Sequence, residues 1–318
     1  MLTLDQVAEL GDDEIAAAAG SRIWRHLRAN PAFWIGAVGV ALIIALALFA
    51  PLLAPYDPFF QFRGNGLTPN GDPLGPTARF PLGTDKLGRD ELSRLLFGAR
   101  TSLLVGIGGT VAATIIGVAI GSVAAFVGDV RRRLRLPGGQ SISVPIPVDS
   151  LLMRFTDAVL SFPILLLAIA LVAVVGPSLG LVVAIVAGFL WTGIARIVYA
   201  RVRVLRELDF VTAARALGAS PGRVLRRHVL PHLASIVVVY STLSVAAAIL
   251  FEATLSFLGV GVPPPSPSWG SMIFDHITYY GSDPRVVLLP GLAIMVTILM
   301  FNVLGDALAD ALDPHAWR

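Results

Sequence analysis

The chain has 318 residues, of which 55% are hydrophobic and only 14% are charged, and its mean hydropathy is +0.77. Water-soluble domains carry about 25% charged residues, so this composition excludes a soluble protein and predicts that most of the surface faces lipid. The sequence contains no cysteine, which excludes disulfide bonds, iron–sulfur ligation and thiolate zinc sites. Its one lysine, Lys86, does not follow a glycine-rich phosphate loop, so the chain is not itself a P-loop ATPase.

Apolar stretches that are long enough to cross a bilayer, which takes about 20 residues each, predict six transmembrane helices and an all-α fold. We expect these helices at 31–54, at 101–128, on either side of a turn at 176–178, at 232–259 and at 286–305. The first is interpreted as a retained anchor because it lacks a small-residue cleavage site. The turn, GPSLG, matches the G-x-S-x-G hydrolase motif, but between two membrane helices a helix-breaking role is favoured.

The distribution of basic residues predicts the orientation of the spans. If the N-terminal segment 1–30 is cytoplasmic, 17 of the 24 lysine and arginine residues fall on the cytoplasmic side and 7 on the outer side. This asymmetry follows the positive-inside rule, so we expect both termini, including the tail 312–318, in the cytoplasm. The isoelectric point of about 9.7 then reflects orientation, and we expect no nucleic-acid partner.

Two loops outside the spans have distinctive compositions. The outer loop 55–100 begins with a segment rich in Pro and Gly, and its second part, 85–100, has an apolar helical face that predicts an amphipathic helix leading into the span at 101. This face carries Leu92, Leu95, Leu96 and Ala99. The cytoplasmic segment 129–148 is rich in arginine and is predicted to be a mobile insertion next to anionic lipid headgroups. Its basic residues are Arg131, Arg132, Arg133 and Arg135.

The cytoplasmic segment 201–231 has the pattern of two short helices. Gly218 is expected to end the first, Ser220 and Pro221 suit the N-cap and first position of the second, and Pro231 is expected to end the second. The first helix carries a face of Phe210, Ala213, Ala214 and Leu217, and the second sets Val224 and Leu225 opposite Arg223, Arg226 and Arg227. Such a helical hairpin is a compact knob that fits a groove in another protein.

The run TAARALGASPGRVLRRHVLP, residues 212–231, resembles the EAA loop of bacterial ABC importer permeases. Ala213, Ala214, Gly218, Leu230 and Pro231 match that pattern at the right spacings, whereas Thr212 stands in place of the usual acidic residue. Four further segments resemble the second permease subunit of dipeptide, oligopeptide and nickel importers. They are LGTDKLGRDELSRLLFGARTSL (82–103), RFTDAVLSFP (154–163), EATLSFLGVGVPPPSPSWG (252–270) and GDALADALDP (305–314).

This resemblance implies a type I permease fold, with a five-helix core over 101–311, in the inner membrane of a bacterium. It also implies three kinds of partner: a homologous permease subunit, two cytoplasmic ATPases and an external solute-binding protein. ATP and Mg²⁺ would be bound by the ATPases, so we expect this chain to have no catalytic residues, no metal and no cofactor of its own. The cargo stays open between dipeptides, oligopeptides, nickel chelates and haem.

The resemblance also assigns candidate roles to particular residues. The ATPase-coupling residues would be Thr212, Ala213, Ala214, Gly218, Arg223, Arg226, Arg227, His228, Leu230 and Pro231. Candidates for the translocation path or its outer gate are Glu252, Ser256, Pro264 and Trp269, and candidates for receptor contacts are Asp85, Arg89 and Asp90. Glu252 lies inside a predicted span, where a charge costs about 2.5–3.5 kcal/mol, so it lines a path or is paired structurally. For Asp85 and Arg89, capping of the amphipathic helix is the favoured alternative.

Other residues have simpler interpretations. Arg154 and Asp157 are three apart and are expected to pair locally or to meet headgroups, and Gly117 and Gly121 form a GxxxG pair that is a weak packing signal. His228 and His232 are four apart, but a helix break at Pro231 would misalign them for a metal.

Two other classes of protein are disfavoured. An ion-coupled carrier would need several intramembrane acidic residues, whereas Glu252 is the clearest one here. An intramembrane hydrolase would need a facing Ser and His, and His276 is the only histidine expected in the outer half.

Overall fold

The protein is predominantly helical in a computed structural model that describes residues 23–127, 129–135 and 141–312. Within these residues, five helices are long and apolar enough to cross a membrane, and a bent helix pair supplies a sixth span. The five are α3 (Pro31–Leu48), α5 (Glu91–Val127), α8 (Leu179–Leu205), α11 (Leu230–Phe257) and α13 (Arg285–Leu312). The expected all-α fold with six spans is therefore confirmed.

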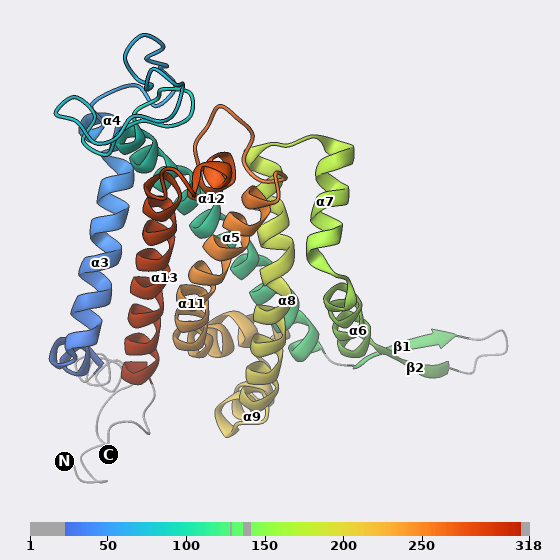
Figure 1. The fold of residues 1–318 in the computed structure, drawn as a ribbon. Coiled ribbons are helices and arrows are strands. Elements are labelled where there is room, and N and C mark those ends of the chain that lie inside the picture. The colour runs from blue at the N-terminus through green and yellow to red at the C-terminus, as the bar shows by residue number, and fades with distance from the viewer. Residues whose placement is uncertain (1–22, 128, 136–140, 313–318) are drawn as a thin grey trace.

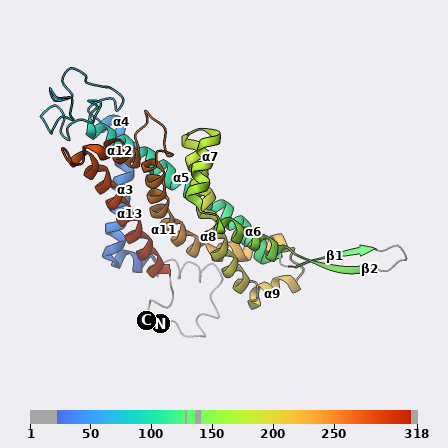
Figure 2. The same cartoon turned by 45° about the vertical axis from the view of Figure 1, so that its right-hand side comes forward.

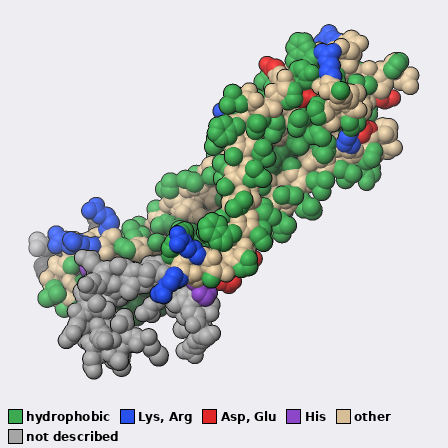
Figure 3. All heavy atoms as spheres, turned by 90° about the vertical axis from the view of Figure 1, so that its left-hand side faces the viewer, with side chains coloured by type: hydrophobic (Ala, Val, Ile, Leu, Met, Phe, Trp, Pro, Cys, Tyr) green, Lys and Arg blue, Asp and Glu red, His purple; other side chains and the backbone are tan. Residues whose placement is uncertain are grey.

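The long helices run side by side between two ends of the molecule. The loop after α4 (Ala50–Leu53) and the short helix α12 (Trp269–His276) lie at one end, and α9 (Asp209–Ala216) lies at the other (Figure 1). The start of α3 and the end of α13 lie at the same end as α9 (Figure 1). Hydrophobic side chains cover much of the length between the two ends, as expected for a lipid-facing surface (Figure 3).

The most extensive contact in the fold is between α5 and α8, and it depends on small residues of α5. A Cβ atom at Gly121 would lie 2.4 Å from the carbonyl oxygen of Ala195, and one at Gly117 would lie 2.8 Å from the Cβ of Ile194. Ala113, on the same face, is fully buried. The Gly117–Gly121 pair is therefore a true close-packing face.

The amphipathic helix expected to lead into the span at 101 begins at Glu91 and is continuous with that span as far as Val127. Leu95, Leu96, Ala99 and Leu103 are good helix formers, and no proline interrupts the backbone hydrogen bonds between them. The outer part of α5 is thus a direct extension of its membrane-spanning part.

The third span is broken rather than straight. Helices α6 (Val148–Ser161) and α7 (Ile164–Val175) meet at an angle of 81°. The break lies at Phe162, which is extended with ψ 134° because the following Pro163 disfavours a helical conformation there. The expected turn after α7 is confirmed, since Gly176 adopts φ +86° and Ser178 caps α8 by accepting a hydrogen bond from the backbone of Leu181.

The segment expected to be a mobile insertion contains an antiparallel hairpin. Strand β1 (Asp129–Arg135) pairs with β2 (Ser141–Pro147), with Arg132 opposite Val144. The hairpin projects away from the helices in both views (Figures 1 and 2). Residues 136–140, between the two strands, lie outside the described residues.

The expected Arg154–Asp157 pair is wrong. Asp157 instead forms an ion pair with Arg196 of α8, so it joins α6 to a neighbouring helix. Arg154 is exposed on the next turn of α6.

Replacing Gly121 with alanine should destabilise the protein, because the new methyl group meets the backbone of α8 rather than a flexible side chain. Overpacking of this kind costs about 1–3 kcal/mol. We expect a clearly lower thermal unfolding midpoint for Gly121→Ala in detergent. The control is Gly188→Ala, since a Cβ there meets nothing within 4 Å and alanine favours the helix by up to about 1 kcal/mol. Equal midpoints for the two variants would contradict this account of the α5–α8 contact.

Candidate functional site

The two-helix hairpin over 209–231, which was predicted to be cytoplasmic, packs firmly on the membrane helices. Val211, Val224 and Val229 are fully buried and belong to one hydrophobic cluster with residues of α5 and α8, among them Phe126 and Val198. Burial of these side chains fixes both short helices against the inner end of the bundle.

Gly218 supplies the sharp turn between the two short helices. Its φ of +85° is a left-handed conformation that residues with a Cβ rarely adopt. The backbone N–H of Ala219 then donates to the carbonyl of Ala214, which satisfies a carbonyl at the end of α9. Ser220 and Pro221 occupy the predicted N-cap and first position of α10 (Pro221–Val224), although the Ser220 side chain makes no capping hydrogen bond.

Pro231 does not end the second helix as expected. The chain continues from α10 through a π-helical turn (Leu225–Val229) directly into α11, with Pro231 in its first turn. A proline lacks the N–H that an α-helix needs and its ring crowds the carbonyl four residues back. The π turn is wider than an α-helical turn, and in it the N–H of Leu230 donates to the carbonyl of Leu225. This wider turn accommodates Pro231 within a continuous helix.

The surface of this hairpin facing away from the bundle is apolar at its tip and basic beside it. Leu217 is 89% exposed and Ala213 is also exposed, while Ala214 is partly covered. The exposed basic residues of the second helix are Arg223, Arg226 and Arg227. Thr212, Gly218 and Pro231 are exposed as well, and His228 and Leu230 are half-buried. The predicted coupling residues therefore share one accessible knob.

Two arginines that sequence reasoning missed, Arg206 at the end of α8 and Arg215 in the knob, contact helix α5. The Nη1 group of Arg206 donates to the carbonyl oxygen of Ala125 at 2.8 Å, and the Arg215 guanidinium lies 5.0 Å from the ring centroid of Phe126. The first contact neutralises a carbonyl at the C-terminal end of α5, and the second is a cation–π interaction. No local pattern could have shown them, because the partners are more than 80 residues apart in sequence.

The two histidines near this loop lie on one continuous helix, contrary to the expected break. The ring of His232 stacks on Phe210 at a centroid distance of 5.2 Å, and its Nδ1 lies 2.8 Å from the carbonyl oxygen of His228. These contacts give His232 a structural role between α9 and α11.

Glu252 lies at the centre of a hydrogen-bonded hub in the outer half of the bundle. It is fully buried, and its two carboxylate oxygens accept from Ser102 of α5 at 2.9 Å and from Ser256 at 2.7 Å. Each serine hydroxyl also accepts a backbone hydrogen bond, Ser102 from Trp269 and Ser256 from Val262. Glu252 thereby ties α5 and α11 to α12 and to the loop before it. In this chain its position favours structural pairing over lining a path.

The other outer-gate candidates divide between interior and surface. Trp269 is 3% exposed, and its ring nitrogen donates to the carbonyl of Leu95, which holds α12 on α5. Ser256 is 3% exposed, whereas Pro264 is exposed on the loop that Glu252 supports.

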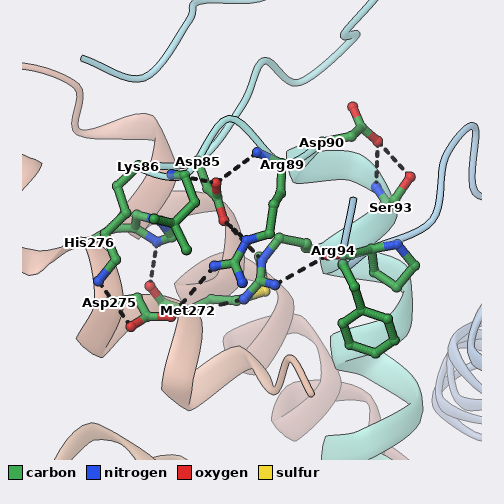
Figure 4. Close-up of polar contacts among 12 residues, drawn as sticks. Asp85, Lys86, Arg89, Asp90, Ser93, Arg94, Met272, Asp275 and His276 are labelled. Atoms are coloured by element: carbon green, nitrogen blue, oxygen red, sulfur yellow. Dashed lines mark hydrogen bonds and ion pairs between the residues drawn. The ribbon is translucent and has the colours of Figure 1, made fainter. Parts of the chain in front are cut away.

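A buried ionic cluster joins the start of α5 to α12 (Figure 4). Asp85 is fully buried, and one of its oxygens accepts from Arg89 Nε at 2.5 Å and faces Arg94 Nε at 3.3 Å. Asp275 of α12 forms an ion pair with Lys86, with 3.1 Å between Nζ of the lysine and Oδ1 of the aspartate. Asp90 is fully buried, and its side chain accepts from the backbone and hydroxyl of Ser93.

These positions change the interpretation of the receptor-contact candidates. Asp85 and Asp90 are fully buried and Arg89 is 6% exposed, so direct contact with an external protein is not supported. The helix cap is Asp90, three residues before Ser93, rather than Asp85 or Arg89. Asp85 instead accepts from the backbone of Leu87 and Arg89 and so fixes the turn before the helix.

Comparisons with known proteins agree with this architecture. Residues 117–318 match the family model of the binding-protein-dependent transport system inner membrane component, and residues 19–69 match the N-terminal transmembrane domain of oligopeptide transport permease C. The chain belongs to this family of transport permeases.

Full-length relatives extend the similarity along nearly the whole chain. The di/tripeptide transport system permease protein DppC of Pseudomonas aeruginosa is 42% identical over 293 residues, covering 92% of this chain and 90% of the relative. The glutathione transport system permease protein GsiD of Escherichia coli O6:K15:H31 is 38% identical, with coverage of 92% and 89%. The dipeptide permease DppC of Alkalihalophilus pseudofirmus is 36% identical, with coverage of 95% and 92%.

The fold is also found in a solved transporter. A chain of the MetNI methionine ABC transporter in an inward-facing conformation aligns with a TM-score of 0.53 and 18% identity, covering 69% of this chain and 96% of that one. The chain is thus a multi-pass ABC importer permease of the inner membrane, with the type I fold expected from its motifs.

Replacing Glu252 with glutamine should loosen the outer loop of the permease. Glutamine keeps one acceptor oxygen but turns an NH₂ group toward one of the two serines. The hydroxyl of that serine loses its acceptor, which weakens its link between residue 252 and the backbone N–H that it binds. We expect the amide of Val262 or that of Trp269, whichever is bonded to the serine that faces the new NH₂ group, to exchange hydrogen for deuterium about tenfold faster, since a buried hydrogen bond is worth about 1–3 kcal/mol. Thr254→Ala is the control, because Thr254 on the same helix bonds only its own helix backbone. Unchanged exchange in Glu252→Gln would refute the hub.

His276 should lower the stability of the permease in mild acid. Burial lowers the pKa of this imidazole, outweighing the opposing effects of Asp85, the Met272 carbonyl and Asp275. An unfolded histidine binds a proton near pH 6.5, whereas the folded one binds it only at lower pH, so the contribution of His276 to stability falls as pH drops below about 6.5. This loss is at most about 1.4 kcal/mol per pH unit, and Glu91, whose pKa burial raises to about 8, acts in the opposite direction in both the wild type and a His276 variant.

We expect the thermal midpoint of the wild type to fall more between pH 7.5 and 5.5 than that of His276→Gln, which stays neutral. The same pH slope in both proteins would show that another group is responsible.

Proposed function

We propose that this chain is a membrane-spanning subunit of an ATP-driven importer of short peptides, and that the 209–231 hairpin is its docking element for a cytoplasmic ATPase. The observation that carries the proposal is the knob itself. It exposes Leu217 and three arginines at one end of the bundle, while Val211, Val224 and Val229 anchor it in the core. An exposed docking element with a firmly packed base can pass a movement of a bound ATPase to the membrane helices.

The cargo assignment rests on the relatives. Their names specify di- and tripeptides, dipeptides and glutathione, all of which are short peptides. We accordingly propose a homologous permease as the second half of the pore, two ATPases beneath it and a solute-binding protein outside. Both termini of this chain would be cytoplasmic, in line with the basic-residue asymmetry.

The mechanism needs no bond chemistry in this chain. ATP binding would close the ATPase pair and displace the docked knobs, and α5 would follow because Arg206 and Arg215 hold its inner end. The helices would then rock between inward-open and outward-open states. Thr212 lacks the carboxylate usual at its position, so Arg223, Arg226 and Arg227 would supply the charged contacts with the ATPase.

Gly218→Pro should leave the protein in the membrane but abolish co-purification of the ATPases, because proline cannot adopt φ +85°. Gly218→Asn is the matched control. Asparagine tolerates the left-handed conformation and a Cβ here meets nothing within 4 Å, so association should persist. The measurement is the ATPase recovered with the tagged permease from membranes that express the whole complex. Undiminished ATPase in Gly218→Pro would refute the docking role.

The transport activity itself is tested by ATP-dependent uptake of a labelled dipeptide into proteoliposomes that contain the complex and its binding protein. Uptake that proceeds without ATPases on an ion gradient would overturn the proposed function.

A further inference from the structure

A small cavity lies at the outer end of the permease beside the buried ionic cluster. Its volume is about 130 Å³, and it is enclosed by α5, α12 and the loop over 259–266. The charged groups that line it are Arg89, Arg94 and Asp275. Two guanidinium groups and one carboxylate line the cavity, while the carboxylate of Asp85 contacts both arginines from behind.

The two guanidinium groups keep hydrogen-bonding capacity on the side of the cavity. Their Nε atoms are turned toward Asp85. Their Nη2 atoms lie 4.0 Å (Arg89) and 3.9 Å (Arg94) from Asp275 Oδ2, which is beyond hydrogen-bond distance. Arg94 also donates from Nη1 to the carbonyl of Pro58. Since Arg94 is 2% exposed, its remaining donors have little access to bulk water.

The size of the cavity limits what can enter. A water molecule needs about 10–15 Å³ of such space, so the cavity holds several waters or one carboxylate with the carbons attached to it. A whole dipeptide does not fit. The rim is formed by exposed residues, Pro264, Pro265 and Ser266, and by Phe274, which is 48% exposed. The rest of a larger ligand would lie on this largely apolar rim.

We propose that this cavity is a carboxylate-binding subsite, and that its ligand is the C-terminal carboxylate of a peptide on its way into the pore. Paired guanidinium groups in a narrow cavity recognise a carboxylate by charge-assisted hydrogen bonds. A terminal carboxylate is common to all linear peptides, so the subsite would bind peptides whatever their side chains. The inference rests on the peptide cargo proposed above.

Asp275 acts as an internal competitor in this proposal. Its carboxylate already faces both guanidinium groups at about 4 Å and is held at its other oxygen by Lys86. An entering carboxylate must take over the Nη donors against the repulsion of Asp275. Removal of this charge should therefore strengthen binding, which a purely structural ionic cluster would not predict.

The test measures binding of Ala-Ala and of its C-terminal amide to the full complex in nanodiscs without the binding protein, by saturation-transfer NMR titration. The acid should bind at least tenfold more tightly than the amide. Arg89→Gln should remove this preference, and Asp275→Asn should strengthen acid binding several-fold. Equal binding of acid and amide, or weaker binding to Asp275→Asn, would overturn the proposal.

A second pair of variants avoids the ionic cluster. Ser266→Trp places a large ring at the mouth of the cavity and should block the acid-specific binding. Ser282→Trp, at another exposed position, should leave it intact.

Two further measurements separate the possible failures. ATP-driven dipeptide uptake by the same preparation tests the proposed function independently of the cavity. If uptake is normal but acid and amide bind equally, only the subsite is wrong. If Ala-Ala does not bind and Arg89→Gln weakens docking of the binding protein instead, the carboxylate comes from that protein, and the peptide assignment fails.

Discussion

The contact between α5 and α8 is the constraint on which the rest of the molecule depends. In lipid, apolar side chains gain little by leaving the solvent, so helices associate through close van der Waals contact at small residues. Gly117 and Gly121 allow the backbones to approach until a single methyl group would collide with Ala195. Helix α8 carries the cytoplasmic hairpin at its inner end, and α5 carries the ionic cluster at its outer end, so this contact joins the two functional regions.

Helix α5 is long enough to connect these regions directly. Its 37 residues extend about 55 Å, whereas the hydrocarbon core of a bilayer is about 30 Å thick. At the inner end Arg206 and Arg215 attach it to the hairpin, and at the outer end Asp90 caps it and Arg94 pairs with Asp85. A continuous helix held at both ends cannot shift at one without shifting the other. This is a physical path between the hairpin and the cavity at the opposite end of the bundle.

Local sequence patterns predicted what depends on local chemistry. The six spans, the turn at Gly176 and the left-handed Gly218 follow from apolar length and from helix-breaking residues, and they are all present. Pro231 was misjudged because a π turn kept the helix continuous. The long-range partners of Glu252, Arg206 and Asp157 could not be predicted, since these contacts join residues 39 to 150 positions apart and depend on how the helices pack.

The two halves of the bundle differ in their buried polar contacts, and this difference bears on motion. The core of the inner half is a cluster of valine, alanine and leucine side chains, whose attraction is non-directional. The outer half adds to its apolar clusters the buried contacts of Glu252, Asp85 and their partners, whose hydrogen bonds and ion pairs require defined geometry. Apolar surfaces can slide and repack at lower cost than such bonds can break. Rocking of the helices should therefore preserve the outer cluster as one unit and be taken up by repacking near the hairpin.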